Sequence, residues 1–151
     1  MDVSIKKKLV GIAMNEAKKA IQEGNSPFGA VLSDLEGNII DVAHNTSNTD
    51  SDPTAHAEIN LIRNVSKKIN SKDLSKFCLI SNAQSCSMCF SAAIKSKIHN
   101  FIYGYAEDET LVPAIDVFEM SKYCKCKVNI ETGILKDECE KQIRQVREMM
   151  K

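Results

Sequence analysis

Two short segments constrain this chain more than any other feature: His56-Ala57-Glu58 and, after a gap of 27 residues, Cys86-Ser87-Met88-Cys89. One imidazole and two thiolates form a zinc-binding set with only three protein ligands, which leaves the fourth tetrahedral position open to water. Structural zinc sites fill that position, whereas catalytic sites keep it free. Any fold of this chain must therefore place the residues near 56 beside those near 86.

Glu58 lies two residues from the predicted ligand His56 and adds a carboxylate beside the open position. Zinc lowers the pKa of a bound water to roughly 7, which makes a nucleophile available at neutral pH. A carboxylate within reach of that water can carry a proton to a leaving group. Glu58 alone would also fit a solvated helix residue, but the neighbouring histidine favours the acid–base role.

The charge of the chain argues against a partner that is recognised mainly through its phosphates. Lysine plus arginine and aspartate plus glutamate number 20 each, so no net field attracts the chain to a nucleic-acid backbone. The local basic segments 6–8, 122–127 and 141–151 lie near acidic residues and are interpreted as solvated surface. A nucleic-acid partner is thus left open but is not favoured.

Length and the N-terminal segment indicate the class of protein. A chain of 151 residues suits a single domain, 1–151, with a sizeable core. The N-terminus, Met-Asp-Val-Ser-Ile-Lys-Lys-Lys, lacks the apolar run of a signal peptide or membrane span. The sequence therefore predicts a cytoplasmic protein without a membrane partner.

The six cysteines are expected to be free thiols or metal ligands, because disulfides are rare in a reducing compartment. Cys78 lies in an apolar run and is predicted to be a buried core residue. A second metal site at Cys124 and Cys126 would need further ligands, so these residues are predicted to be structural thiols.

Hydrophobic periodicity predicts a first helix over 4–23, closed by Gly24 as a C-cap glycine would close it. Strands at 28–33 and 38–43 flank an acidic, glycine-containing turn, which indicates an antiparallel hairpin. The further predicted elements are strands at 77–81, 100–105 and 127–130 and helices at 52–65, from 86 onward, at 111–121 and at 135–149. The order αββαβαβαβα predicts a central sheet with helices on both faces.

The predicted helix starts decide how the motif residues can meet. Asp52 is predicted to cap the second helix and Pro53 to be its first residue, so His56 and Glu58 would lie within the helix and point about 200° apart. They could then converge only if the turn faces the site end-on. Ser85 is predicted to cap the next helix, so that Cys86 and Cys89 share one face and the helix dipole favours both thiolates.

A His/Cys/Cys zinc set with an unligated glutamate is the pattern of the zinc deaminases. The chain resembles the cytidine-deaminase-like superfamily over nearly its whole length, in the branch that holds guanine deaminases, fungal cytosine deaminases and bacterial tRNA adenosine deaminases. The segments that carry the resemblance are 27–31, 44–45, 52–58, 86–89 and 133–139. The resemblance implies an α/β fold, a three-layer αβα sandwich with a five-stranded mixed sheet, and a homodimer with the site near its interface.

The resemblance also implies a role for each site residue. One zinc ion per chain would be bound by His56, Cys86 and Cys89, and Glu58 would transfer protons. The substrate would meet the Asn45 side chain, the Ala57 amide, the Phe28 ring and the backbone at Gln84. Two alternatives stay open, because Asn45 would also suit a turn and Phe28 would also suit core packing.

The chain departs from the family at Gln84-Ser85, where the family usually has Glu-Pro or Ser-Pro. Ser85 adds an N–H donor and backbone freedom that proline would remove. Since the ligands remain, zinc binding is expected to survive, and the substrate-facing backbone is where a change is expected.

The function expected from these residues is hydrolytic: a zinc-dependent deaminase that removes an exocyclic amino group from a free nucleobase or nucleoside, of guanine or cytosine type, and releases ammonia. It would act on C–N bonds in cyclic amidines. The first alternative is a tRNA-specific adenosine deaminase. The second, motivated by Gln84-Ser85, is a catalytically silent zinc scaffold that pairs with an active subunit.

Overall fold

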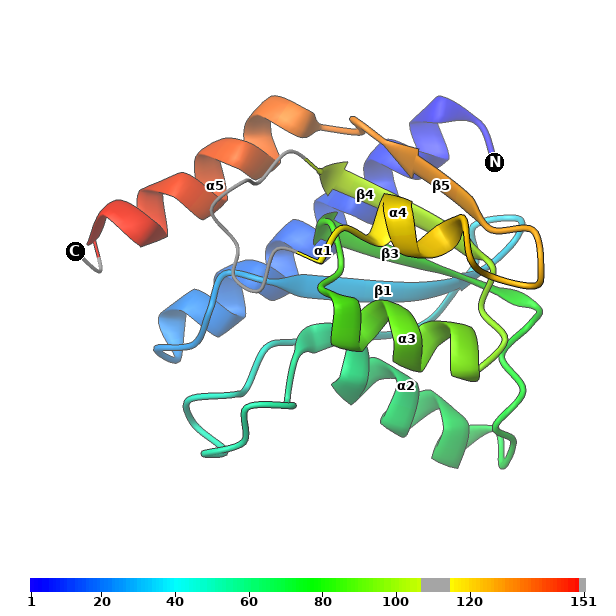
Figure 1. Cartoon of the computed structure of the whole chain (residues 1–151). Coiled ribbons are helices and arrows are strands. Elements are labelled where there is room, and N and C mark those ends of the chain that lie inside the picture. Colours follow the sequence, from blue (N-terminus) through cyan, green and yellow to red (C-terminus); the bar gives the residue numbers. More distant parts are fainter. Residues whose placement is uncertain (107–114, 150–151) are drawn as a thin grey trace.

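The computed structural model describes residues 1–106 and 115–149, in which helices and strands alternate as the sequence predicts (Figure 1). The helices are α1 (Val3–Gln22), α2 (Ala57–Lys68), α3 (Ser87–Lys95), α4 (Val117–Ser121) and α5 (Lys136–Met149). The strands are β1 (Gly29–Asp34), β2 (Ile39–His44), β3 (Phe77–Ala83), β4 (Asn100–Tyr105) and β5 (Asn129–Thr132). None of the helices in the described part is both long and apolar enough to cross a membrane.

The five strands form one mixed sheet in the order β2-β1-β3-β4-β5. β1 is antiparallel to both β2 and β3, and β3, β4 and β5 run parallel to one another. The predicted hairpin and the predicted five-stranded α/β fold are thus confirmed.

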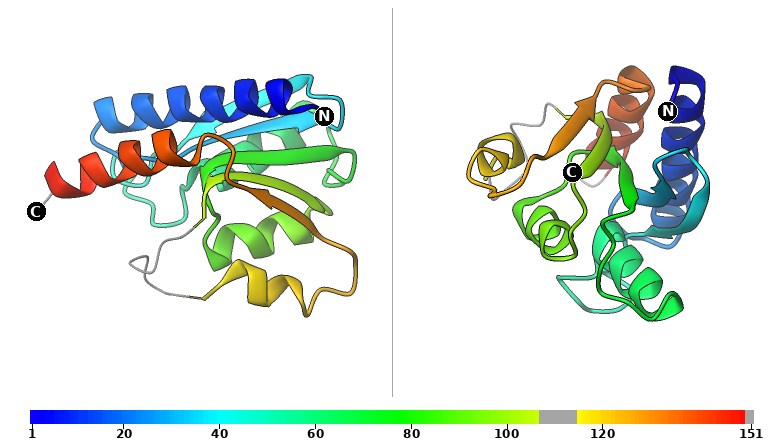
Figure 2. Two further views of the ribbon diagram at one scale, coloured as in Figure 1. Left: turned by 90° about the horizontal axis from the view of Figure 1, so that it is seen from above. Right: turned by 90° about the vertical axis from the view of Figure 1, so that its right-hand side faces the viewer.

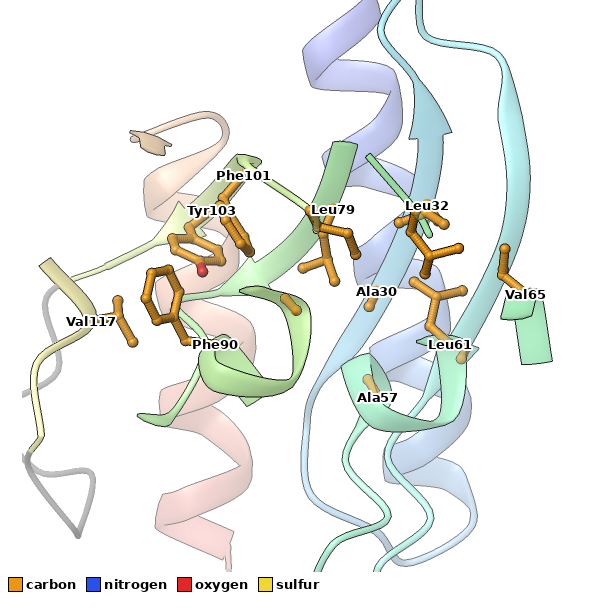
Figure 3. Close-up of a cluster of buried hydrophobic side chains, with 14 residues drawn as sticks. Ala30, Leu32, Ala57, Leu61, Val65, Leu79, Phe90, Phe101, Tyr103 and Val117 are labelled. Carbon is orange, nitrogen blue, oxygen red and sulfur yellow. The ribbon is translucent and has the colours of Figure 1, made fainter. Parts of the chain in front are cut away.

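Helices cover both faces of the sheet (Figure 2): α1 and α5 lie on one face, and α2, α3 and α4 lie on the other. Successive side chains of β1 point to opposite faces, so Val31 packs under α1 whereas Ala30 and Leu32 join the core under α2 and α3. Figure 3 shows this second core. The centroid of the Phe101 ring lies 5.3 Å from that of the Phe90 ring and 6.0 Å from that of the Tyr103 ring. The core on the α2–α3 face therefore supports the segments that carry the zinc motif.

The predicted starts of the middle helices are wrong. The Asp52 carboxylate accepts a hydrogen bond from the Thr54 N–H at 2.8 Å and closes a local turn, so α2 begins only at Ala57. α3 begins at Ser87 with Cys86 in the capping position instead of Ser85. α4 begins at Val117; residues 111–114 of its predicted range lie outside the described residues. The short polar side chains at these positions can form either a turn or a helix cap, and the sequence pattern does not distinguish the two.

The start of β1 lies directly against the backbone of α1. A Cβ atom at Gly29 would lie 2.6 Å from the Ala17 backbone nitrogen and would also clash with the Ala13 carbonyl oxygen. Because both obstacles are backbone atoms, no rotamer change can relieve the clash. Only glycine allows the strand to approach the helix this closely.

Gly29→Ala is expected to lower the free energy of unfolding by about 1–3 kcal/mol or more, since α1 must move to admit the methyl group. The matched control is Gly11→Ala within α1, where a Cβ atom would meet nothing within 4 Å. There alanine should raise the free energy of unfolding by up to about 1 kcal/mol through helix propensity. Urea unfolding of both variants measures the difference, and equal effects of the two substitutions would contradict the close approach.

Candidate metal centre and active site

The starts of α2 and α3 bring the motif residues together. His56 Nδ1 lies 3.6 Å from Cys86 Sγ and 3.4 Å from Cys89 Sγ, and the ligand atoms of these residues all lie within 4.8 Å of one another. Tetrahedral zinc ligands at about 2.0–2.3 Å from the ion are separated by about 3.5 Å. The donor set and its spacing therefore fit one zinc ion, as the sequence predicts. It is the only such group of His, Cys, Asp and Glu side chains among residues 1–106 and 115–149.

The convergence depends on two capping residues in extended conformation. His56 has φ −71° and ψ 157°, Cys86 has φ −73° and ψ 169°, and neither side chain caps its own helix. His56 is thus the residue just before the first turn of α2, while Glu58 lies within that turn. This removes the 200° divergence that a helix start at Pro53 would impose, because only one of the two residues is helical.

Glu58 is buried beside the ligand group, with 5% of its surface exposed. Burial raises the pKa of its carboxyl above the ordinary value, and the nearby Cys86 sulfur raises it further. A raised pKa brings a carboxyl closer to the range in which it can both accept and return a proton. The position and the environment of Glu58 both suit a proton carrier.

The ligand side chains shift one another's pKa values. A hydrogen bond from the Cys89 thiol lowers the pKa of Cys86 to about 4, and His56 contributes in the same direction. The same hydrogen bond raises the pKa of Cys89, and the Cys86 sulfur raises the pKa of His56. The group thus favours thiolate at Cys86, and a cation that prefers thiolate and imidazole ligands would displace the remaining protons.

Two buried hydroxyl groups, which the sequence analysis did not assign to the site, lie near Glu58. Ser85 is 2% exposed and lies near enough to Glu58 to lower the pKa of that carboxyl, although less than burial raises it. The Tyr103 hydroxyl, also buried, approaches Ser85 and has no hydrogen-bond partner of good geometry among the described residues. The sequence signal for Ser85 was its place where the family has proline; Tyr103 resembled an ordinary strand residue.

Asn45, which is predicted to bind substrate, holds a turn through one end of its side chain. Its Oδ1 accepts hydrogen bonds from the Ser47 N–H at 2.9 Å and the Ser47 hydroxyl at 2.8 Å, as in the turn that was the alternative interpretation. The Nδ2 group of Asn45 donates to no residue in the described ranges. The turn role is thus observed, and substrate binding by Asn45 stays a prediction.

The other predicted contacts have mixed environments. Phe28 is half-buried and packs against the core under α1, which fits core packing as well as a pocket wall. Ala57 is the first residue of α2, where a helix N–H lacks an intrahelical acceptor and can meet a ligand. The Gln84 N–H donates to the Tyr105 carbonyl at 2.8 Å, which fixes the backbone between β3 and the zinc ligands.

The remaining thiols divide by burial. Cys78 and Cys139 are buried, and burial raises the pKa of each to about 12, so the predicted core role of Cys78 is confirmed. Cys124 and Cys126 are half-buried.

With zinc bound, an aromatic disulfide reagent at pH 8 is expected to modify Cys126 and Cys124 within minutes and to reach Cys78 and Cys139 only after unfolding, because the thiolate is the reactive form. Peptide mapping checks this, and rapid modification of Cys78 in the folded protein would contradict it.

Comparison with known proteins agrees with this geometry. The model of the family described as the cytidine and deoxycytidylate deaminase zinc-binding region matches residues 3–105. The tRNA-specific adenosine deaminase of Haemophilus influenzae is 33% identical over 141 residues, which cover 90% of this chain and 79% of that protein.

Two solved structures show how far the fold extends. A structure from a study of A-to-I editing by tRNA:A34 deaminases at the wobble position of transfer RNA has a TM-score of 0.79 and 26% identity, and the alignment covers 89% of this chain and 98% of that one. The guanine deaminase of Bacillus subtilis has a TM-score of 0.63 and 28% identity over 76% of this chain and 73% of its own. This fold thus occurs in deaminases that are named for different substrates.

Proposed function

Because this chain belongs to the cytidine and deoxycytidylate deaminase family of zinc-binding hydrolases, we propose that it deaminates adenosine within transfer RNA. The observation that carries the proposal is the His56, Cys86 and Cys89 cluster beside the buried Glu58 in a chain that is 33% identical, over 90% of its length, to a tRNA-specific adenosine deaminase. The sequence motifs favoured a free nucleobase or nucleoside, and the relatives support the tRNA alternative better.

In the proposed mechanism, His56, Cys86 and Cys89 would hold the zinc ion, which when bound would make water nucleophilic at neutral pH. Glu58 takes a proton from the water that attacks the amino-bearing ring carbon and delivers it to the neighbouring ring nitrogen, which receives the electron pair of the attacked C=N bond. Glu58 then carries the second proton of the former water from the new hydroxyl group to the exocyclic nitrogen, so that the C–N bond breaks, ammonia leaves and a carbonyl replaces the amino group. The Ser85 side chain, which lies beside Glu58, would hold its carboxyl in place.

The substrate base would be oriented by groups around this centre. The side-chain amide of Asn45 and the Ala57 N–H would donate to the ring, and the half-buried Phe28 would form a wall of the pocket. Since a stacked base cannot reach such a centre, the adenosine would have to be unstacked from its loop. A single-stranded anticodon loop makes that step less costly than a duplex does.

The balanced charge of the chain predicts how the RNA is held. With 20 basic and 20 acidic residues, few phosphates can be neutralised, and each one contributes about −0.7 to −0.9 to the slope of log K against log salt. We therefore expect a shallow salt dependence, with affinity coming mainly from the loop bases.

The test is ammonia release and inosine formation on an anticodon stem-loop with adenosine at the wobble position, compared with free adenosine, guanine and cytosine. Activity on the stem-loop alone supports the proposal. Activity on a free base alone would overturn it in favour of the nucleobase alternative, and no activity on any substrate would leave the zinc scaffold.

The homodimer that the family resemblance implies is tested on the same samples by light scattering, with twice the mass of one chain as the expected result.

A further inference from the structure

The side chain of Asn82 joins three parts of the fold in a position that the zinc site does not use. Asn82, near the end of β3, is fully buried. Its Oδ1 accepts a hydrogen bond from the Gly29 N–H at 3.1 Å, and its Nδ2 donates to the Pro27 carbonyl at 2.9 Å and to Gln142 Oε1 at 3.2 Å. Since an N–H only donates and a carbonyl only accepts, these partners define the orientation of the amide.

Gln142 extends this contact into both helices on that face of the sheet. It lies on α5, and its Nε2 donates to the Met14 carbonyl of α1 at 2.9 Å. Its amide is thus used at both ends, by α1 and by Asn82. A buried polar group that loses such a partner is costly, because no water replaces it.

α5 also packs closely against β4, next to Asn82. A Cβ atom at Gly104 in β4 would clash with Cys139 Sγ of α5 and would lie 3.0 Å from the Asn82 carbonyl oxygen. Cys139 of α5 thus lies directly over Gly104, in the strand next to that of Asn82. This packing and the Gln142–Asn82 hydrogen bond together connect α5 to the end of β3.

The segment that Asn82 holds carries the predicted wall of the substrate pocket. Phe28 lies between the two residues whose backbone groups bond Asn82, and its carbonyl accepts from the Asn45 N–H at 3.1 Å. On the opposite side, Gly29 is pressed against the backbone of α1. The Phe28 segment is thus clamped between α1 and Asn82, and Asn45 is attached to it.

We infer that Gln142 and Asn82 are positioning residues through which the C-terminal helix α5 holds the Phe28 wall of the pocket and, with it, Asn45. The inference rests on the proposed function for the identity of the substrate and for the assignment of Phe28 and Asn45 to the substrate pocket. Loss of the Gln142 contact should loosen the wall and weaken substrate binding, while the zinc ligands and Glu58 keep their geometry.

The experiment compares Gln142→Leu with Gln145→Leu, a glutamine on the same helix that is exposed. Amide hydrogen exchange at Gly29 and Asn45, whose N–H groups report the clamped segment, is measured on the zinc-loaded full chain. Gln142→Leu should raise both exchange rates about fivefold, as expected for one lost hydrogen bond, and Gln145→Leu should leave them unchanged. Gln142→Met serves as a second variant should the leucine variant not fold.

Kinetics on the active substrate separate positioning from general destabilisation. KM should rise about fivefold in Gln142→Leu with kcat within about twofold of the wild type and one zinc per chain. In an Asn82→Ala background the Gln142→Leu change should add nothing, because the two residues act through one contact. Equal loss of kcat and zinc would show a merely structural role and overturn the inference.

Failure of the proposed function and failure of the inference give different results. A wild-type protein that deaminates nothing defeats the proposed function, and the exchange rates at Gly29 and Asn45 then decide the inference alone. An active protein in which Gln142→Leu changes neither KM nor these exchange rates defeats the inference and leaves the function standing.

Discussion

Glu58→Gln is expected to reduce kcat by about 10²–10⁴-fold while one zinc ion stays bound per chain. Glutamine has nearly the same shape and can hydrogen-bond, but it cannot take a proton from water and return it to the leaving nitrogen. Because Glu58 is 5% exposed and is not one of the clustered ligands, the exchange removes a buried acid without opening the metal site. Single-turnover kinetics on the active substrate, with metal content measured on the same sample, checks both parts.

The matched control is Glu36→Gln, which alters an exposed glutamate in the turn between β1 and β2. It should keep wild-type kcat and zinc. A Glu58→Gln variant that stays within about threefold of the wild type would remove Glu58 from the mechanism. A variant that loses zinc as well would point to a ligand or a support for the ligands instead of a proton carrier.

Cys89→Ala is expected to abolish stoichiometric zinc binding and, with it, measurable deamination. Cys89 is fully buried, and its sulfur lies 3.4 Å from His56 Nδ1, so its truncation removes one of the three clustered ligands from inside the site. Loss of an outer-shell partner alone costs about 10–100-fold in metal affinity, and loss of a direct ligand should cost more. Competition with a chromogenic chelator measures the affinity.

The control for this prediction is Cys78→Ala, another buried thiol that lies in β3 under α1. It should retain one zinc ion per chain and lose only the stability of a small core truncation. Addition of a strong chelator should lower the melting temperature of the wild type and of Cys78→Ala but leave that of Cys89→Ala unchanged, since only a protein that binds the metal is stabilised by it. Retention of zinc by Cys89→Ala would refute the ligand assignment.

The fold class and the zinc cluster could be predicted from local patterns. The 3.6-residue period marked the first helix, because burial of one helix face imposes that period, and short β-prone or apolar runs marked the strands. The motif residues His56, Cys86 and Cys89 could be assigned because few chemistries other than zinc binding require imidazole and thiolates in this arrangement. The chain pattern did not reveal how they converge: that depends on His56 and Cys86 being extended caps, which is decided by turns at Asp52 and after β3.

Contacts between distant segments account for what the patterns missed. Asn82 and Gln142 are 60 positions apart, and nothing near either residue in the chain predicts their hydrogen bond. Asn82 lies just beyond the strand predicted over 77–81, and its partners meet it only after β1, β3 and α5 have packed. The burial that raises the pKa of Glu58 has the same origin. Residue type and spacing supplied the chemical groups, and the packing of helices on the sheet supplied their environment, because burial and long-range hydrogen bonds arise only when separate elements meet.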